Sequence, residues 1–247
     1  MTIHHEVHGT GPALLLIHAG VADSRMWAAQ RDDLAKDHLV VTLDLRGYGE
    51  TPLAPGTEYS DADDVLAVLD ALGLDTVTAV AASYGANVAL QAASHKPQRF
   101  NRLVLFSPPL DEVDATEDLR AFATKENALL EAGDIAQATA LNVQTWLGPE
   151  AGEEARALVT EMQANAFQIQ IAAGDDIKNA EYAVQPDRIA VPVTVYDGAH
   201  DLEFFHRTTK YLAEALPDAQ LVTLPWAGHL AALERPAETT ALIRAAL

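Results

Sequence analysis

Short apolar runs alternate with amphipathic stretches along most of this 247-residue chain, and this alternation restricts the possible folds more than any other feature. The apolar runs lack the alternating polar residues of a strand that has one wet face, which indicates strands buried on both faces. They occupy residues 13–18, 39–45, 76–82, 102–108, 191–197 and 219–225. Helical patterns fill the intervals at about 26–36, 60–72, 84–95, 204–216 and 231–246. The sequence therefore predicts an α/β fold, with a mainly parallel sheet covered by helices on both faces and an edge strand at "IHHEV" (3–7).

The alternation stops between residues 111 and 185, where the pattern is helical throughout. Asp114 and Glu117 fit a capping box at the start of a helix, and Gly133 fits a helix end. A later helix is indicated by apolar residues at helical spacing, namely Ala155, Leu158, Val159, Met162 and Ala166. We expect residues 111–185 to form a small helical lid, inserted into a core made of residues 1–110 and 186–247.

Composition excludes several classes of protein. The formal net charge of −20 makes the surface repel nucleic acid and anionic lipid, so neither is expected as a partner. The absence of cysteine excludes disulfides and thiolate chemistry. No run of about 18 apolar residues is long enough to span a membrane, and "MTIHHEVHGTG" does not have the pattern of a signal peptide. We therefore expect a cytoplasmic protein.

The stretch "VAASYGANVAL" (80–90) places Ser83 between a predicted strand and a predicted helix. In open α/β sheets, ligands bind beyond the carboxyl ends of the strands, which is where Ser83 would lie. A tight turn at that corner needs small neighbours, and the chain supplies Ala81, Ala82, Gly85 and Ala86. Two interpretations are open: Ser83 caps the helix, or its hydroxyl is raised above the sheet edge as a nucleophile.

A serine nucleophile needs a base to accept its proton and an acid to orient that base. Asp201 follows the predicted strand in "VPVTVYDGAHD", and His229 follows the one in "LVTLPWAGHLAALERP". Both therefore lie past the carboxyl ends of strands, on the same edge as Ser83. His200 is a poorer candidate for the base, because its side chain and that of the adjacent Asp201 would diverge at a strand end.

Five segments, in this order, resemble motifs of the α/β-hydrolase fold superfamily: "LLLIHAG", "DLRGYGET", "VAASYGAN", "YDGAHD" and "AGHLAALERP". The resemblance covers essentially the whole chain, and the short lid and the "HAG…MW" opening are similar to the esterase, lactonase and cofactor-free perhydrolase branches. It implies that Ser83 is the nucleophile, His229 the general base and then acid, and Asp201 the residue that orients the imidazole. It also implies an oxyanion hole made of the backbone N–H groups of Gly20 and Tyr84. The chain departs from the family pattern at Ala19 and Ala81, where glycine is usual.

The predicted function is a serine hydrolase of the carboxylic ester hydrolase type. It would cleave a small-molecule ester or lactone through an acyl-enzyme, without a metal or organic cofactor. The lid aromatics Trp146, Phe122 and Phe167 are candidates for the pocket wall. Perhydrolysis, acyl transfer, C–C bond hydrolysis and a slow-turnover ligand receptor stay open as alternatives. Substrate identity, oligomeric state and lid movement do not follow from the sequence.

Several other polar residues allow a functional interpretation but have a plainer structural one. His18 is expected to anchor the loop after its strand, and Asp44 and Arg46 to stabilise their loop. A metal site is conceivable at the N-terminal histidines, but an exposed strand face is favoured for His4, His5 and His8. Trp27 is expected to pack the first helix against the core.

Overall fold

A seven-stranded sheet with the order β1–β3–β2–β5–β6–β8–β9 lies at the centre of the computed structural model, which describes residues 3–247. The β1–β3 pair is antiparallel and all other neighbours in this sheet are parallel. The strands are β1 (His5–His8), β2 (Ala13–Ile17), β3 (Leu39–Leu43), β5 (Val77–Ala82), β6 (Phe100–Phe106), β8 (Val193–Gly198) and β9 (Ala219–Leu224). The predicted α/β fold, its parallel sheet and its N-terminal edge strand are confirmed.

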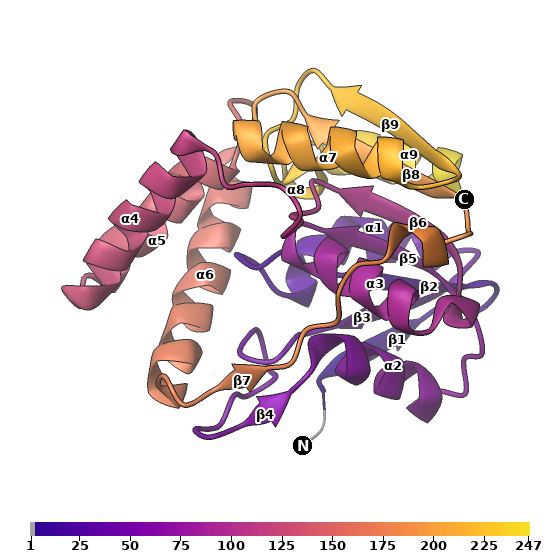
Figure 1. Ribbon diagram of the computed structural model, residues 1–247, viewed down its shortest axis with the longest axis horizontal. Coiled ribbons are helices and arrows are strands. Elements are labelled where there is room, and N and C mark those ends of the chain that lie inside the picture. The colour runs from indigo at the N-terminus through magenta and orange to yellow at the C-terminus, as the bar shows by residue number, and fades with distance from the viewer. Residues whose placement is uncertain (1–2) are drawn as a thin grey trace.

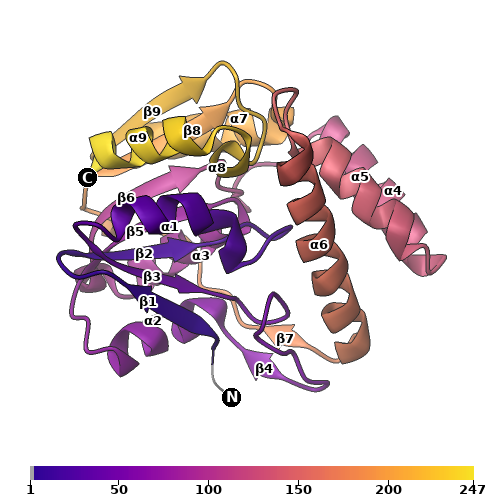
Figure 2. The ribbon, with the colours of Figure 1, turned by 180° about the vertical axis from the view of Figure 1, so that it is seen from behind.

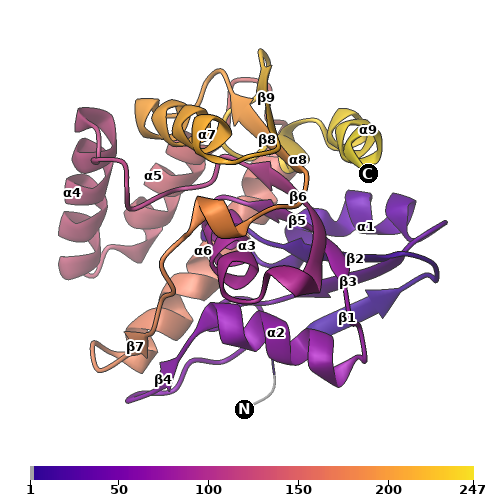
Figure 3. The ribbon, with the colours of Figure 1, turned by 45° about the vertical axis from the view of Figure 1, so that its right-hand side comes forward.

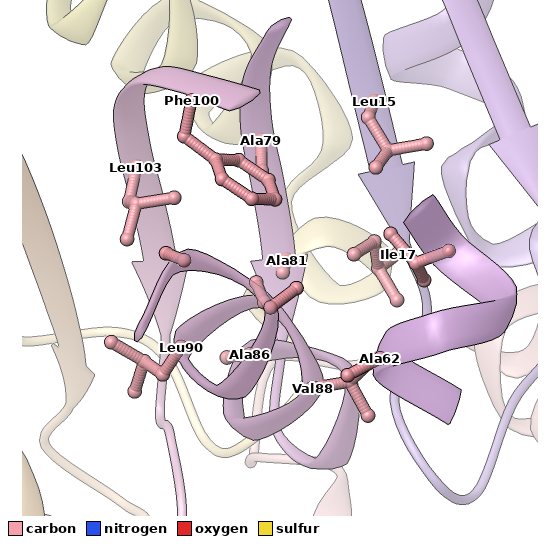
Figure 4. Packing of buried hydrophobic residues seen from close by; sticks show 14 of the residues in the cluster. Leu15, Ile17, Ala62, Ala79, Ala81, Ala86, Val88, Leu90, Phe100 and Leu103 are labelled. Carbon is pink, nitrogen blue, oxygen red and sulfur yellow. The ribbon is translucent and has the colours of Figure 1, made fainter. Parts of the chain in front are cut away.

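Helices cover both faces of this sheet (Figures 1 and 2). They are α1 (Ala28–Leu34), α2 (Asp61–Ala71), α3 (Tyr84–His95), α7 (Glu203–Ala215) and α9 (Pro236–Ala246). Alternate residues of a strand point to opposite faces, so Leu15 and Ile17 pack with α2 and α3, while Leu14 and Leu16 pack with α1 and α9. Figure 4 shows the first of these layers, where Ile17 and Ala81 lie near Ala86 and Val88 of α3. Each buried Leu or Ile side chain contributes about 1.5–3 kcal/mol to the free energy of unfolding.

The C-terminal helix predicted over residues 231–246 is two helices, α8 (Ala231–Glu234) and α9. Arg235 between them has φ −136° and ψ 79°, outside the helical region. Pro236 is the cause, because a proline disfavours the helical conformation of the residue before it. The break turns the chain directly after Glu234.

The helix predicted at about 26–36 begins with a 3₁₀ turn, η1 (Ser24–Trp27), in which Trp27 is buried against the core.

Three helices join β6 to β8 and stand to one side of the sheet (Figures 1 and 3). They are α4 (Glu117–Glu131), α5 (Ile135–Trp146) and α6 (Glu153–Ala173). The capping box predicted at Asp114 is wrong, because the residue that precedes α4 is Thr116. Gly133 has φ +73° in the turn between α4 and α5, as a helix end favours. Within residues 3–247, no helix is long and apolar enough to cross a bilayer.

The chain returns from α6 along a short segment that the sequence did not predict. β7 (Lys178–Asn179) pairs in parallel with β4 (Glu58–Tyr59), which precedes α2, and together they form a separate two-stranded sheet. Figure 1 shows this pair to the right of the lower end of α6. Two further 3₁₀ turns, η2 (Pro97–Arg99) and η3 (Pro186–Arg188), lead into β6 and β8. The end of the inserted helices is therefore attached to the core at a place far from β6.

Candidate active site

Ser83 occupies a strained corner between β5 and α3. Its φ of 51° and ψ of −124° lie in a region that residues with a side chain rarely adopt. Its backbone N–H donates to the carbonyl of Phe106 on the neighbouring strand at 2.8 Å, which holds the turn against β6. The hydroxyl makes no capping hydrogen bond to α3, so the helix-cap interpretation is wrong. The side chain is partly exposed, as a nucleophile must be.

Small residues near Ser83 allow the loop after β2 to approach closely. A Cβ atom added to Gly85 would lie 2.3 Å from the carbonyl oxygen of His18, so only glycine fits there. A Cβ on Gly20 would lie 3.2 Å from the Cβ of Tyr84, which places Gly20 beside the Ser83 corner. Among residues 3–247, no acceptor is recorded for the backbone N–H of Gly20 or of Tyr84. Both groups predicted for the oxyanion hole are therefore neighbours and available as donors.

His18 holds the loop that carries Gly20. Its Nδ1 lies 2.8 Å from the carbonyl of Ala19, and the backbone N–H of Leu45 donates to its Nε2 at 2.9 Å. Burial lowers the pKa of His18, and a neutral imidazole that donates at Nδ1 and accepts at Nε2 satisfies both contacts. The carbonyl of Ala19 also accepts from Ala22, at 3.0 Å. These contacts agree with the loop-anchor interpretation of His18.

His229 and Asp201 form a buried pair. The Nδ1 atom of His229 lies 2.7 Å from Oδ2 of Asp201, and the two side chains are 2% and 0% exposed. The other carboxylate oxygen of Asp201 accepts from the backbone N–H of Leu202 at 2.8 Å. His200 is exposed instead, and its backbone N–H donates to Ala227. The acid is therefore paired with the histidine that the family resemblance assigned.

Aromatic side chains enclose the imidazole of His229. The ring of Phe205 lies 4.2 Å from it and that of Trp146 4.8 Å, measured between centroids. The carbonyl of Trp146 also accepts from the backbone N–H of His229 at 3.2 Å. Phe122 packs edge-on against Trp146 at 4.7 Å, and Phe167 is buried in α6. Trp146 thus supports the histidine, and the pocket-wall role of the three aromatics stays a prediction.

Glu234 is a site residue that the sequence analysis missed. Its buried carboxylate accepts from the backbone N–H of Gly228 at 2.9 Å and from that of Leu230 at 3.3 Å. It therefore holds the peptide groups on both sides of His229. Burial raises the pKa of Glu234, although these hydrogen bonds oppose the shift. An acidic residue within the apolar stretch "LAALE" was the available signal.

The serine and the Asp–His pair lie along the same edge of the sheet. β5 and β8 are separated by β6 alone, so their ends are about 10 Å apart at the usual strand spacing. A Cβ on Gly198 would lie 2.0 Å from the carbonyl oxygen of Gly228, so the His229 loop packs on the end of β8. Among residues 3–247, no hydrogen bond is recorded between the hydroxyl of Ser83 and His229. Such contacts are often long in the absence of substrate.

The remaining polar candidates have structural partners. Asp44 accepts from the backbone N–H groups of Ser24 and Glu50, at 2.8 and 2.9 Å. Arg46 forms an ion pair with Asp64 of α2. These contacts stabilise the loop after β3, as expected. Within residues 3–247, no group of three metal-ligating side chains could hold an ion.

Comparison with known proteins shows the family to which the chain belongs. The sequence model of the alpha/beta hydrolase fold matches residues 12–236, and the chain belongs to this family. A relative from Caulobacter sp. (strain K31), named "Putative carbamate hydrolase RutD", is 31% identical over 242 residues, which cover 92% of this chain and 88% of the relative. A protein of the same name from Pseudomonas savastanoi pv. phaseolicola is 28% identical over 248 residues, covering 95% and 93% of the two chains.

Two solved structures illustrate the similarity in three dimensions. Est816, described as an N-acyl homoserine lactone degrading enzyme, is 25% identical with a TM-score of 0.79, over 99% of this chain and 96% of its own. A thermophilic esterase from Thermogutta terrifontis is 26% identical with a TM-score of 0.81, over 98% and 92% of the two chains. The protein is thus similar to hydrolases that act on small molecules.

Proposed function

We propose that the protein is a serine hydrolase that cleaves a carboxylic ester or lactone through an acyl-enzyme. The observation that carries this proposal is the buried His229–Asp201 pair, 2.7 Å apart, on the sheet edge where the strained Ser83 corner lies. A serine hydroxyl is a weak nucleophile near neutral pH until an oriented imidazole accepts its proton. The similarity to a lactone-degrading enzyme and to an esterase supports the ester and lactone class.

The mechanism assigns each group one task. The hydroxyl oxygen of Ser83 attacks the carbonyl carbon while Nε2 of His229 accepts its proton. The carbonyl oxygen becomes an oxyanion that the N–H groups of Gly20 and Tyr84 stabilise, and one such donor is worth about 10²–10³ in rate. His229 then protonates the leaving alkoxide. In the second half, His229 accepts a proton from the attacking water and returns it to the Ser83 oxygen as the acid product leaves, while Asp201 accepts the hydrogen bond from Nδ1 throughout.

A carbamate is the second candidate substrate. The relatives with 31% and 28% identity are both named as carbamate hydrolases. A carbamate carbonyl can be attacked by the same serine and gives a similar oxyanion, so the site needs no further group to act on it.

We propose a cytoplasmic location on the composition alone, since the chain has no cysteine.

The test combines a substrate panel with covalent labelling. The panel contains p-nitrophenyl esters of increasing acyl length, lactones and a p-nitrophenyl carbamate. Ser83→Ala should lower kcat/KM by more than about 10³-fold, because no other group on this edge replaces the nucleophile. A fluorophosphonate probe should form an adduct on Ser83. Retained hydrolysis by Ser83→Ala, or an adduct on another residue, would contradict the nucleophile assignment.

Ser107 provides a matched control. It directly follows β6 beside the Ser83 corner, and it is the other non-glycine residue with a left-handed φ among residues 3–247, at 46°. Ser107→Ala should keep both hydrolysis and labelling, because its hydroxyl has no part in the mechanism.

A product survey with water, peroxide and alcohols separates hydrolysis from perhydrolysis and acyl transfer. A ketone substrate of the C–C hydrolase type tests that alternative, and one labelling event without turnover identifies a slow receptor.

A further inference from the structure

A buried polar cluster lies beside the proposed oxyanion hole, outside the Ser–His–Asp residues. The hydroxyl of Tyr84 donates to Oδ2 of Asp61 at 2.5 Å. The amide nitrogen of Asn179 lies 3.0 Å from the same carboxylate oxygen and 2.7 Å from the Tyr84 hydroxyl. Asp61 is 3% exposed, whereas Tyr84 and Asn179 are half-buried, so the three side chains form a triangle closed around a buried carboxylate. None of the three hydrogen bonds is needed to build the sheet.

The three residues come from separate parts of the chain. Tyr84 is the first residue of α3, directly after the nucleophile, and Asp61 begins α2. Asn179 belongs to β7, on the segment that returns from the inserted helices. Backbone hydrogen bonds seat this segment: Ala180 donates to Tyr59 at 2.6 Å, and Lys178 donates to Thr57 at 3.0 Å. The amide of Asn179 therefore reaches Tyr84 only when β7 is paired with β4.

The ring of Tyr84 lies against the loop that supplies the second oxyanion donor. A Cβ on Gly20 would lie 3.2 Å from the Cβ of Tyr84 and 3.5 Å from the hydroxyl of Tyr48. The Tyr48 and Tyr84 rings are themselves 6.5 Å apart. The side chain of Tyr84 is thus held at its hydroxyl by Asp61 and Asn179, and along its ring by the Gly20 loop. Hydrogen bonds to a carboxylate are stronger than neutral ones, which makes this anchor stiff.

We propose that Asp61 and Asn179 are positioning residues for the oxyanion hole, acting through the phenol of Tyr84. They fix the ring, and the ring sets the spacing between the backbone N–H groups of Tyr84 and Gly20. When β7 is paired with β4, it therefore helps to position the oxyanion donors, in addition to attaching the end of α6 to the core. This inference rests on the proposed serine hydrolase function.

The test removes the phenol oxygen and leaves the backbone donor in place. Tyr84→Phe should lower kcat about tenfold, less than the 10²–10³ expected for loss of a whole donor. KM should change less than about twofold, because the ground state does not depend on the oxyanion donors. A trifluoromethyl ketone that forms a hemiketal with Ser83 should bind more weakly by the same factor as the loss in kcat. Asn179→Ala should shift kcat and ketone affinity in the same direction.

Tyr182 supplies the matched control. It lies on the same return segment, and its hydroxyl also donates to an acid of α2, Asp63, at 3.0 Å. This contact is exposed and does not involve Tyr84 or the Gly20 loop, so Tyr182→Phe should keep kcat and ketone affinity at the wild-type values. A purely structural role for the cluster would lower thermal stability but would leave kcat per labelled site unchanged.

The outcomes separate this inference from the proposed function. If the wild-type protein is not labelled at Ser83, the proposed function fails. If labelling succeeds but folded Tyr84→Phe keeps the wild-type kcat and ketone affinity, the positioning role is overturned. It is also overturned if Tyr182→Phe shows the same loss. If Tyr84→Phe does not fold, Asn179→Ala decides: unchanged kcat and ketone affinity in that variant overturn the proposal.

Discussion

At the scale of single residues, Asp61 is a carboxyl group in a place that disfavours its charge. Burial raises the pKa of Asp61 to about 6, against the hydrogen bond from Tyr84, which lowers it, and with a further rise from nearby Asp64. The ordinary value is 3.8, so the folded protein binds a proton at this carboxyl over a pH range in which the unfolded chain has lost it. The anchor of Tyr84 is therefore strongest above the pKa of Asp61, where the carboxylate is charged.

Asp61→Asn should change how stability depends on pH. Because the folded pKa exceeds the unfolded value, Asp61 contributes stability that is complete below about pH 4 and is lost as the pH rises through about 6. The pKa difference corresponds to at most about 3 kcal/mol. The variant lacks this term, so its free energy of unfolding relative to wild type should increase from about pH 4 to about pH 7. Urea titrations across that range measure it, and a difference that is constant or falls with pH would contradict the assignment.

At the scale of elements, the strands could be predicted because burial on both faces leaves a local signature. The predicted strand at 76–82 is β5 (Val77–Ala82), and the one at 191–197 is β8 (Val193–Gly198); both are buried along their whole length. The β4–β7 pair could not be predicted, since each strand has two residues and no periodicity. Its two partners are also far apart in sequence, so only the packed fold brings them together.

The same distinction holds for the candidate site. The edge that carries Ser83, Asp201 and His229 follows from the rule that parallel strands end on one side. The contacts of Glu234 and Asn179 do not follow from any local pattern. Each depends on the tertiary fold, which brings backbone N–H groups to Glu234 and the phenol of Tyr84 to Asn179. Asn179 gives no signal in the sequence, whereas Glu234 is conspicuous as an acid among apolar residues.

Glu234 at the end of α8 should matter both for stability and for activity. Glu234→Ala leaves the buried N–H groups of Gly228 and Leu230 without an acceptor, which costs about 1–3 kcal/mol for each group. The loop of His229 loosens, so kcat/KM for an ester should also fall. Glu234→Gln keeps an acceptor oxygen and should lose less of both. Urea unfolding and steady-state kinetics measure the two effects.

A control for this variant lies on α9. Glu238 is exposed and pairs with Arg235 at 3.8 Å, so Glu238→Ala should change the free energy of unfolding by less than about 1 kcal/mol. Equal losses in Glu234→Ala and Glu234→Gln would show that the contact needs the negative charge, because glutamine keeps the volume and one acceptor oxygen of glutamate. Unchanged stability in both would contradict the role of Glu234 in holding the loop.

At the scale of the whole molecule, charge influences which substrates arrive at the site. The formal net charge is −20, and the field of such a surface repels anions over about one Debye length, roughly 10 Å at 0.1 M salt. This field does not affect an uncharged ester. The protein should therefore discriminate between substrates before any contact with the pocket.

Salt dependence tests this long-range effect. For an ester with a free carboxylate, kcat/KM should rise severalfold between about 10 and 300 mM NaCl, because screening removes the repulsion. The matching methyl ester, which is neutral, should change little over the same range. Parallel salt profiles for the two substrates would show that the net charge does not act at the active-site edge.

The position of β7 sets a boundary for exchanging parts between related hydrolases. β6 and β8 are neighbours in the sheet, so the chain between them could be replaced as a cassette without altering any other strand pair of the seven-stranded sheet. A cassette that extends through residue 185 would also remove Asn179, and with it a hydrogen bond to the residue that follows the nucleophile. A chimaera whose junction lies between α6 and β7 exchanges the helices α4, α5 and α6 and retains that hydrogen bond.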